Sequence, residues 1–389
     1  MRLVYCTHSL CSPGGMERVL SFKASHFAKL KGWEVIIITT DQKGRSPFFN
    51  LHPHIELIDL GINYSDDNRF SSLGKIKGYL RKRRIHRKRL TDLLYTLKPD
   101  VVVSLYPSES SFIPDIKDGS MKVLETHYSR FFRLQYNRKG IIGLIDRLRT
   151  LQDYHIVKRF DRFVVLTRQD ASQWKGLDKL IVMPNPAIMN SIDKSDTMNK
   201  SDIINKSDTS RHRIIAVGRL DYQKGFDRLI EVWKTLSDHN ALGDWKLEIF
   251  GKGEWYGMLQ SRIHEYGLEH SVSILSPVHD IESEYAASSV LVMTSHYEGF
   301  PMVLLEAMSA GLPVVSFDCP CGPAEIIKDG ENGYLVPDGD IKGFASRLRQ
   351  LMENGRLRKF MSRNAVNSME RFSERKIMDA WMSIFERRS

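Results

Sequence analysis

The sequence lacks the long apolar runs that cross membranes. No window of the 389 residues approaches roughly 18 uncharged apolar positions, so the sequence predicts no transmembrane helix. The first ten residues, MRLVYCTHSL, are too short and too polar for a signal peptide. We expect them to form a first strand.

Cysteine is also scarce. The four cysteines, Cys6, Cys11, Cys319 and Cys321, form no C-x-x-C pair and no Cys/His spacing typical of metal sites. The sequence therefore predicts free thiols in a reducing cytoplasm.

The first half of the chain is short of acidic residues. Residues 1–185 carry 32 Lys and Arg against 18 Asp and Glu, a net charge of +14, whereas residues 186–389 carry 25 and 29, a net of −4. This asymmetry indicates an anionic partner for the first half: nucleic acid, an anionic membrane or a phosphorylated substrate. Because no zinc-finger, helix-turn-helix or RNA-platform pattern is present, we expect no nucleic acid partner.

Short runs rich in Val and Ile alternate with helical patterns along the chain. With little polar alternation, such runs are typical of parallel strands buried on both faces, and they predict two doubly wound α/β domains. The expected strands are 2–8, 34–40, 100–106, 122–127, 162–167 and 180–184 in the first half, and 213–218, 245–251, 272–276, 289–295 and 313–317 in the second.

A segment without hydrophobic periodicity separates the two halves. Residues 184–210 are rich in Asn, Ser, Asp and Lys, and Lys-Ser-Asp recurs every six residues, too closely for a stacking repeat. We interpret the segment as a low-complexity insertion beside the interdomain linker. The predicted organisation is a domain over 1–185, a linker over 186–212, a domain over 213–370 and a helix over 371–389 that packs back toward the first domain.

Glycines and cations follow the first strand of each half, where α/β sheets bind phosphates. Gly14 and Gly15 would let a ligand approach the backbone, although taken alone they also suit a plain tight turn. Arg219 and Lys224 could clamp a diphosphate, with a solvated loop as the alternative.

The next glycine turn, FGKGEW, carries Gly251 and Gly253, which could let a nucleobase lie against the backbone.

Two carboxylates surround a turn in HYEGFPMVLLEAMSAGLPVV, residues 296–315. Glu298 follows a buried strand, and Glu306 lies about one turn into a helix that Gly311 ends. A carboxylate in the helix can accept hydrogen bonds from paired hydroxyls, as on a ribose. The residues from Gly299 to Val303 offer free N–H groups to phosphate. The alternative is a capping acid and a helix-surface glutamate.

One D-x-D motif occurs, at Asp338 and Asp340. We expect Asp340 to cap a helix, and we expect no metal site.

The motifs GRLDYQKG (218–225), EGFPMVLLEAMSAGLPVV (298–315) and GPAEIIKDGENGYLVPDGD (322–340) together resemble the retaining glycosyltransferases of family 4. The resemblance covers nearly the whole chain in order. CPCGPAEII (319–327) resembles the branch that builds lipid-linked oligosaccharides and bacterial surface polysaccharides. The implied fold is GT-B, α/β, with two Rossmann-like domains facing across a cleft: an N-terminal acceptor-binding domain and a C-terminal nucleotide-sugar-binding domain.

The resemblance also implies roles for single residues. Arg219 and Lys224 would bind the donor diphosphate, Glu306 the ribose hydroxyls and Glu298 the transferred sugar. His127, which ends a first-half strand, matches a family position that contacts the 6-hydroxyl region, although taken alone it suits a structural histidine. Further contacts are implied for the Gly14–Gly15 loop, under the phosphates and near the acceptor, and for the backbone of Phe300, Pro301, Met302, Val303 and Leu304.

The implied reaction retains the anomeric configuration. The leaving diphosphate would help to deprotonate the acceptor hydroxyl, while Arg219 and Lys224 stabilise its charge, and no metal or cofactor is expected. Glu306 should lie too far from the anomeric carbon to act as a hydrolase-type nucleophile. We expect a UDP-linked hexose or N-acetylhexosamine as donor, with GDP-mannose as the alternative, and a lipid-linked saccharide as acceptor. A soluble acceptor and a non-catalytic nucleotide-sugar-binding subunit are the alternative functions.

Two basic segments with interleaved apolar residues, 78–97 and 128–150, lie in the first half. Such segments favour anionic membrane surfaces, and a solvated basic face is the alternative. We therefore expect a cytoplasmic protein attached peripherally to the inner face of the cytoplasmic membrane.

Overall fold

The computed structural model describes residues 1–69, 72–105, 109–135, 139–188 and 212–386. The chain divides into two compact units. The first unit consists of Met1–Pro184 and Arg375–Ser389, and the second unit consists of Asn185–Glu374. The predicted insertion at 189–210 lies outside the described residues.

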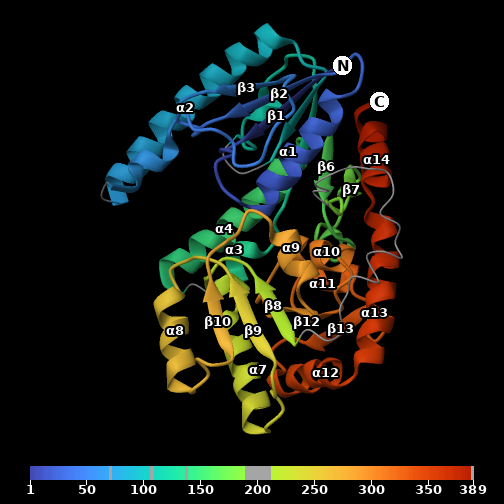
Figure 1. Ribbon diagram of the computed structural model, residues 1–389. Coiled ribbons are helices and arrows are strands. Elements are labelled where there is room, and N and C mark those ends of the chain that lie inside the picture. The colour runs from blue at the N-terminus through green and yellow to red at the C-terminus, as the bar shows by residue number, and fades with distance from the viewer. Residues whose placement is uncertain (70–71, 106–108, 136–138, 189–211, 387–389) are drawn as a thin grey trace. The chain divides into compact units, whose positions relative to one another are not determined.

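The first unit contains a seven-stranded parallel sheet in the order β3-β2-β1-β4-β5-β6-β7 (Figure 1). Its strands are β1 (Arg2–Thr7), β2 (Glu34–Thr39), β3 (Ile55–Asp59), β4 (Val101–Ser104), β5 (Met121–Glu125), β6 (Arg162–Val165) and β7 (Leu180–Val182). Cys6 of β1 pairs with Ile38 of β2 on one side and Ser104 of β4 on the other. The strand order reverses between β1 and β4, and open α/β sheets bind ligands beyond the carboxyl ends of the strands at such a point.

Helices cover both faces of this sheet, because successive strand residues point to opposite faces. Leu3 and Tyr5 share a core with α1 and α14, whereas Val4 and Cys6 share a second core with α2 and the end of α4. The helices are α1 (Gly15–Ala28), α2 (Ser72–Leu97), α3 (Phe132–Gln135), α4 (Gly140–Val157), α5 (Arg168–Gln173) and α14 (Glu374–Glu386).

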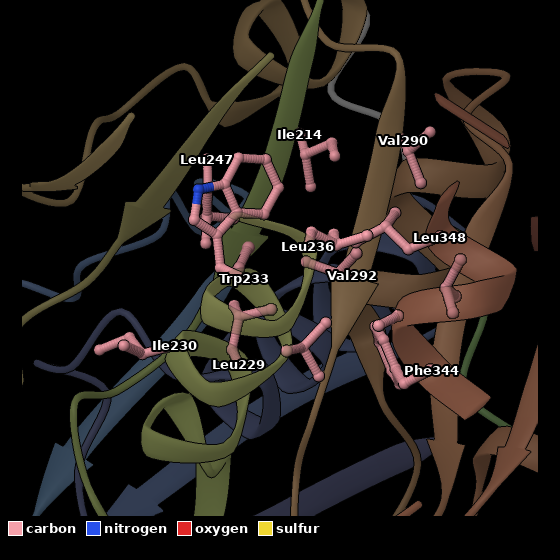
Figure 2. Close-up of a cluster of buried hydrophobic side chains, with 14 of the residues drawn as sticks. Ile214, Leu229, Ile230, Trp233, Leu236, Leu247, Val290, Val292, Phe344 and Leu348 are labelled. Carbon is pink, nitrogen blue, oxygen red and sulfur yellow. The ribbon is translucent and has the colours of Figure 1, made fainter. Parts of the chain in front are cut away.

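The second unit contains a six-stranded parallel sheet in the order β10-β9-β8-β11-β12-β13. Its strands are β8 (Arg213–Val217), β9 (Lys246–Phe250), β10 (Val272–Leu275), β11 (Val290–Met293), β12 (Val314–Asp318) and β13 (Gly333–Pro337). The helices are α7 (Phe226–Asp238), α8 (Tyr256–Glu265), α9 (Ile281–Ala286), α10 (Met302–Ser309), α11 (Pro323–Ile326), α12 (Ile341–Glu353) and α13 (Gly355–Ser368). Figure 2 shows Trp233 of α7 and Phe344 of α12 in the core of this unit, with strand residues Ile214, Leu247 and Val292.

The predicted α/β class and its parallel sheets are confirmed. Each predicted strand is observed, with ends that differ by at most two residues. The prediction missed two strands, β3 and β13, and both lie at sheet edges. An edge strand is covered less completely, so its sequence need not be a continuous apolar run: the residues of β3, Ile55 to Asp59, are all at least partly exposed.

The C-terminal helix α14 contributes to the core of the first unit. Ile377, Met378, Trp381 and Phe385 are buried there with residues of α1 and β1.

Among the described helices, none is long and apolar enough to span a membrane.

Candidate active site

The loop after β8 carries the two predicted cations. Asp221 begins a short 3₁₀ helix, Tyr222–Lys224, by accepting a hydrogen bond from the Lys224 N–H at 3.3 Å. Gly225 ends this turn with φ +60°, and a Cβ there would lie 2.3 Å from the carbonyl oxygen of Thr294. The position requires glycine for both reasons, since the loop packs directly against the chain that leaves β11.

Lys224 and Glu298 form the centre of the candidate site. Lys224 Nζ lies 2.7 Å from Glu298 Oε1, and Ser295 Oγ donates to the same oxygen at 2.7 Å. Glu298 is 5% exposed, so its charge needs these partners. Its N–H donates to the carbonyl oxygen of Pro320 at 3.1 Å, which ties it to the CPCGP loop.

Arg219 lies on the same loop with 68% of its side chain exposed. Its Nη2 donates to Gln223 Oε1 at 2.9 Å and lies 3.3 Å from Asp221. Among the described residues, its side-chain partners are Gln223 and Asp221 on its own loop, and the guanidinium retains access to an anion from solvent.

The second predicted carboxylate, Glu306, is half-buried on α10. Its Oε2 accepts a hydrogen bond from the fully buried Tyr285 hydroxyl at 3.0 Å, which fixes the carboxylate. The predicted end of this helix is confirmed: Gly311 has φ +82°, and the N–H groups of Gly311 and Leu312 donate to Met308 and Ala307 carbonyls.

Gly299 to Leu304 form the turn and the first residues of α10. The helix begins at Met302 after Pro301, so the N–H groups of its first turn include donors without intrahelical partners. The side chains of Phe300, Pro301, Met302 and Leu304 are buried, which leaves only their backbone for a ligand. Gly322 supports the turn, because a Cβ there would meet Pro301 Cδ at 2.4 Å.

Gly251 and Gly253 pack against the loop that carries Arg219. A Cβ at Gly251 would lie 2.0 Å from the Gly218 carbonyl oxygen, and one at Gly253 would lie 2.3 Å from the Leu220 carbonyl oxygen. These contacts give both glycines a packing role, and contact with a nucleobase stays a prediction.

His127 follows β5 in the first unit, and only 6% of its side chain is exposed. Its Nε2 lies 3.2 Å from Glu125 Oε1, and Lys23 Nζ donates to both Glu125 oxygens at 2.6 and 2.5 Å. Lys23 also lies 3.9 Å from the centre of the Trp381 ring. Burial alone would raise the pKa of Glu125, but the charges of Lys23 and His127 lower it to about 2.

The Gly14–Gly15 loop begins α1. Gly14 is the N-cap with φ −83°, and its carbonyl oxygen accepts from Arg18 N–H at 3.0 Å. The pair therefore places a helix N-terminus just after β1, as the sequence predicted, without a left-handed turn.

Sequence reasoning missed several residues that orient this site. Arg228 donates to the carbonyl oxygens of Thr294 and Ser295 at 2.6 and 2.7 Å and pairs with Asp338 at 2.8 Å. Ser295, Tyr285, Lys23 and Glu125 were also not singled out. Glu125 alone carried a signal, since it lies two strand positions before His127 and shares its side of the sheet.

The D-x-D motif is accounted for within the fold. Asp340 caps α12 by accepting from Gly343 N–H at 2.9 Å, which confirms the predicted capping role. Across the described residues, no group of three or more His, Cys, Asp or Glu side chains is arranged to hold a metal ion.

Comparisons with known proteins agree with this geometry. Residues 198–368 match the family described as glycosyl transferases group 1. The chain is 29% identical over 377 residues to an uncharacterized glycosyltransferase of Haemophilus influenzae, with 96% of each chain covered. It is 42% identical over 174 residues to the amylovoran biosynthesis glycosyltransferase AmsD of Erwinia amylovora, which covers 45% of this chain and 48% of that one. The chain thus matches about half the length of AmsD.

Solved structures share the fold at low identity. The crystal structure of TarM superposes with a TM-score of 0.76 at 15% identity, covering 99% of this chain and 98% of that one. WaaG, a glycosyltransferase involved in lipopolysaccharide biosynthesis, gives 0.72 at 19% identity with 99% of each chain covered. Residues 198–368 are thus similar to the glycosyl transferases group 1 family, and the chain has the two-unit α/β fold of the GT-B glycosyltransferases.

Proposed function

We propose that the chain is a retaining hexosyltransferase of family 4. It moves a hexose or N-acetylhexosamine from a nucleotide sugar, most simply a UDP-sugar, to a lipid-linked saccharide in surface polysaccharide assembly. The observation that carries this proposal is the contact between Lys224 and the buried Glu298 at the carboxyl end of β11, next to the first turn of α10.

The second unit provides chemistry for each part of a nucleotide sugar. Lys224 and Arg219 bind the diphosphate and stabilise the charge that it gains as it leaves. The first-turn N–H groups of α10 add donors to phosphate or sugar oxygens. Glu306, oriented by Tyr285, accepts the ribose hydroxyls, and Glu298 accepts hydroxyls of the transferred sugar.

Related proteins support the donor and the pathway. The Anabaena protein HepE, which has the same fold with a TM-score of 0.72 at 17% identity, was solved with UDP and glucose. AmsD is named for amylovoran biosynthesis, and a relative 33% identical over 167 residues is the lipopolysaccharide 1,6-galactosyltransferase of Escherichia coli. These names favour a UDP-sugar donor and a surface polysaccharide product.

The first test is donor binding across a panel of UDP- and GDP-sugars. We expect one UDP-sugar to bind, and Lys224→Ala to weaken it roughly 10- to 100-fold through loss of a charge-assisted hydrogen bond. Glu306→Gln keeps an acceptor for Tyr285 but removes the charge, and should weaken the same donor. Lys234→Ala is the matched control, because Lys234 lies on α7, where it pairs with Asp238 and lies 6.0 Å from the centre of the Tyr266 ring, away from the loop that carries Lys224. Absence of binding to every nucleotide sugar would contradict both the proposed transferase and a non-catalytic nucleotide-sugar-binding subunit.

Stereochemistry and metal dependence are tested on the product. Proton NMR of the first product formed should show the anomeric configuration of the donor, and inversion would contradict the proposed mechanism. Transfer should survive EDTA, since the charge on the leaving diphosphate is offset by Arg219 and Lys224. Loss of transfer in EDTA, restored by Mg²⁺ or Mn²⁺, would contradict the metal-free proposal.

We further propose that the basic first unit attaches the protein to the inner face of the cytoplasmic membrane, where the lipid-linked acceptor resides. The described part of α2 exposes Arg81, Arg84, Arg87 and Lys88, and α4 exposes Leu144, Leu148 and Leu151 along one face. Basic and apolar side chains together favour anionic lipid. Flotation with anionic vesicles should recover the protein, and equal recovery with neutral vesicles would contradict the electrostatic part.

A further inference from the structure

A histidine and a carboxylate meet at the carboxyl end of the first unit's sheet. His8 follows β1 and Asp41 follows the neighbouring strand β2. His8 Nδ1 lies 3.4 Å from Asp41 Oδ2 and 3.3 Å from the Thr40 hydroxyl. The backbone fixes the pair as well, because the His8 carbonyl oxygen accepts from the N–H groups of Thr40 and Asp41 at 3.1 and 3.0 Å.

The Asp41 carboxylate is immobilised and ionised. Oδ1 accepts from the Ser65 N–H and hydroxyl at 3.1 and 2.9 Å, and Oδ2 accepts from Tyr64 N–H at 3.2 Å. Burial tends to raise the pKa of Asp41, but the hydrogen bonds from Ser65 and Thr40 and the charge of His8 hold it below its usual range. The side chain is only 2% exposed, and its charge acts on His8 as well as on Tyr64 and His86.

This arrangement determines which ring nitrogen of His8 is available. A carboxylate opposite Nδ1 favours the tautomer that carries its proton on Nδ1. Nε2 is then an unprotonated acceptor on the opposite side of the ring. The His8 side chain is 48% exposed, unlike the almost fully buried His127, so an outside group can reach the ring.

The position of His8 in the sheet is that of a ligand-binding residue. β1 is one of the two strands between which the order reverses, and α1 begins with Gly14 and Gly15 a few residues later. His127 follows β5, two strands away across β4, which corresponds to about 10 Å along the same edge. The two histidines therefore border one edge of the first unit.

We propose that His8 is an acceptor-binding residue: its Nε2 accepts a hydrogen bond from a hydroxyl of the acceptor saccharide, and Asp41 is the positioning residue that holds the ring in the required tautomer. This inference rests on the proposed function and adds a residue for its second substrate. No covalent step is involved at His8. A hydroxyl fits better than a phosphate, because the unprotonated Nε2 accepts a hydrogen bond from a hydroxyl, whereas a phosphate oxygen needs a donor.

The tautomer is tested first, by ¹⁵N NMR of the histidine rings in the full chain without ligand. We expect the His8 resonances of a ring protonated on Nδ1, and we expect Asp41→Asn to abolish that preference. A His8 ring protonated on Nε2 in the wild type would overturn the proposal. Thermal unfolding of Asp41→Asn checks that the Tyr64–Ser65 turn survives.

Binding is tested by titrating octyl glycosides of glucose, galactose and N-acetylglucosamine while following the His8 Nε2 resonance. At least one glycoside should shift it, and no shift with any of them overturns the proposal. His8→Asn keeps a donor to Asp41 but does not reach outward, and should weaken that glycoside roughly tenfold. His8→Gln places an acceptor near the Nε2 position and should recover part of the affinity. His54→Ala, at the opposite end of β3, should have no effect.

UDP-sugar binding measured in the same samples separates the two hypotheses. Normal donor binding in His8→Asn with weakened glycoside binding supports both. Normal donor binding with unchanged glycoside binding overturns only the role of His8. If the wild type binds no UDP-sugar, the proposed function itself is overturned, whether or not the glycosides bind.

Discussion

Lys23, Glu109 and Glu125 of the first unit are almost fully buried. Lys23 and Glu125 form an ion pair beside Trp381, whereas Glu109 accepts a single described side-chain hydrogen bond, from Ser104 at 2.8 Å. A buried ion pair adds little net stability, yet removing one partner leaves an uncompensated charge. We therefore expect the Lys23–Glu125 pair and Glu109 to respond differently to mutation and to pH.

Glu125→Gln should destabilise the first unit strongly. It leaves the buried Lys23 ammonium without its anion, which typically costs about 3–5 kcal/mol. Urea unfolding measures the loss. Glu34→Gln is the control, because Glu34 pairs with Arg2 at the surface and should change stability by less than about 1 kcal/mol. Equal effects in the two variants would contradict the assignment of a buried pair.

Because of Glu109, we expect the free energy of unfolding to fall as the pH rises. Burial raises its pKa from 4.5 to about 7 in the folded protein, although the Ser104 hydrogen bond opposes the shift. Between pH 4.5 and about 7, Glu109 is ionised in the unfolded chain but protonated in the folded protein. The free energy of unfolding therefore declines up to about pH 7 and then levels off. The total loss is roughly 3 kcal/mol at most. Urea unfolding at pH 5 and pH 8 measures how much the free energy of unfolding changes between the two pH values. This change should be smaller in Glu109→Gln than in the wild type, and an equal change in both proteins would contradict the role of Glu109.

At the scale of elements, the second unit's loops are fixed by close backbone contacts. The loop after β8 lies against the loop after β9 through Gly251 and Gly253, and against the end of β11 through Gly225. Arg228 secures the same end of β11 through two carbonyl oxygens. These contacts set the relative positions of Lys224 and Glu298.

Gly251→Ala should therefore weaken both stability and donor binding. Its Cβ would meet the Gly218 carbonyl oxygen at 2.0 Å, and the loop that carries Arg219 would have to move. We expect a loss of roughly 1–3 kcal/mol by thermal unfolding, together with weaker UDP-sugar binding. Gly257→Ala is the matched control: nothing lies within 4 Å of its added Cβ in α8, so stability should hold or rise slightly. If Gly251→Ala binds the UDP-sugar as tightly as the wild type, the turn at Gly251 does not position the donor-binding loop.

The sequence predicts the elements better than it predicts their contacts. Val- and Ile-rich runs revealed most strands, including the edge strands β7 and β10. They did not reveal β3, whose residues are all at least partly exposed, or β13, a mostly buried strand that begins with Gly333 and ends with Pro337. Glu298 and Lys224 were identified from motifs that follow two neighbouring strands, β11 and β8. Tyr285, Arg228 and the His8–Asp41 pair were not, because their partners come from distant segments that only the folded sheet brings together.

At the scale of the whole molecule, the first unit is discontinuous in sequence. It consists of Met1–Pro184 and Arg375–Ser389, so the second unit lies between its two segments along the chain. The returning helix α14 supplies Trp381 and Phe385 to the core around Phe27. The first unit is thus incomplete without residues that follow the second.

Deletion of residues 375–389 should destabilise the first unit and spare the second. The deletion removes several buried apolar side chains and exposes Lys23, and Trp381→Ala alone should cost about 3–5 kcal/mol. Residues 185–374, expressed alone, should unfold cooperatively at the temperature of one of the two transitions expected for the full chain. Calorimetry distinguishes the units, and a truncated chain with both transitions unchanged would contradict this account.

The return of α14 also bears on synthesis in the cell. A ribosome releases residues 1–184 long before the helix that completes their core, whereas all of the second unit emerges before α14 does. Domains generally fold as units during translation, N-terminal first. Here that order is reversed: the second unit can mature on the nascent chain, while the first leaves exposed the part of its core around Phe27 that α14 covers. Chaperones should therefore engage the nascent chain at its N-terminal segment for most of its synthesis.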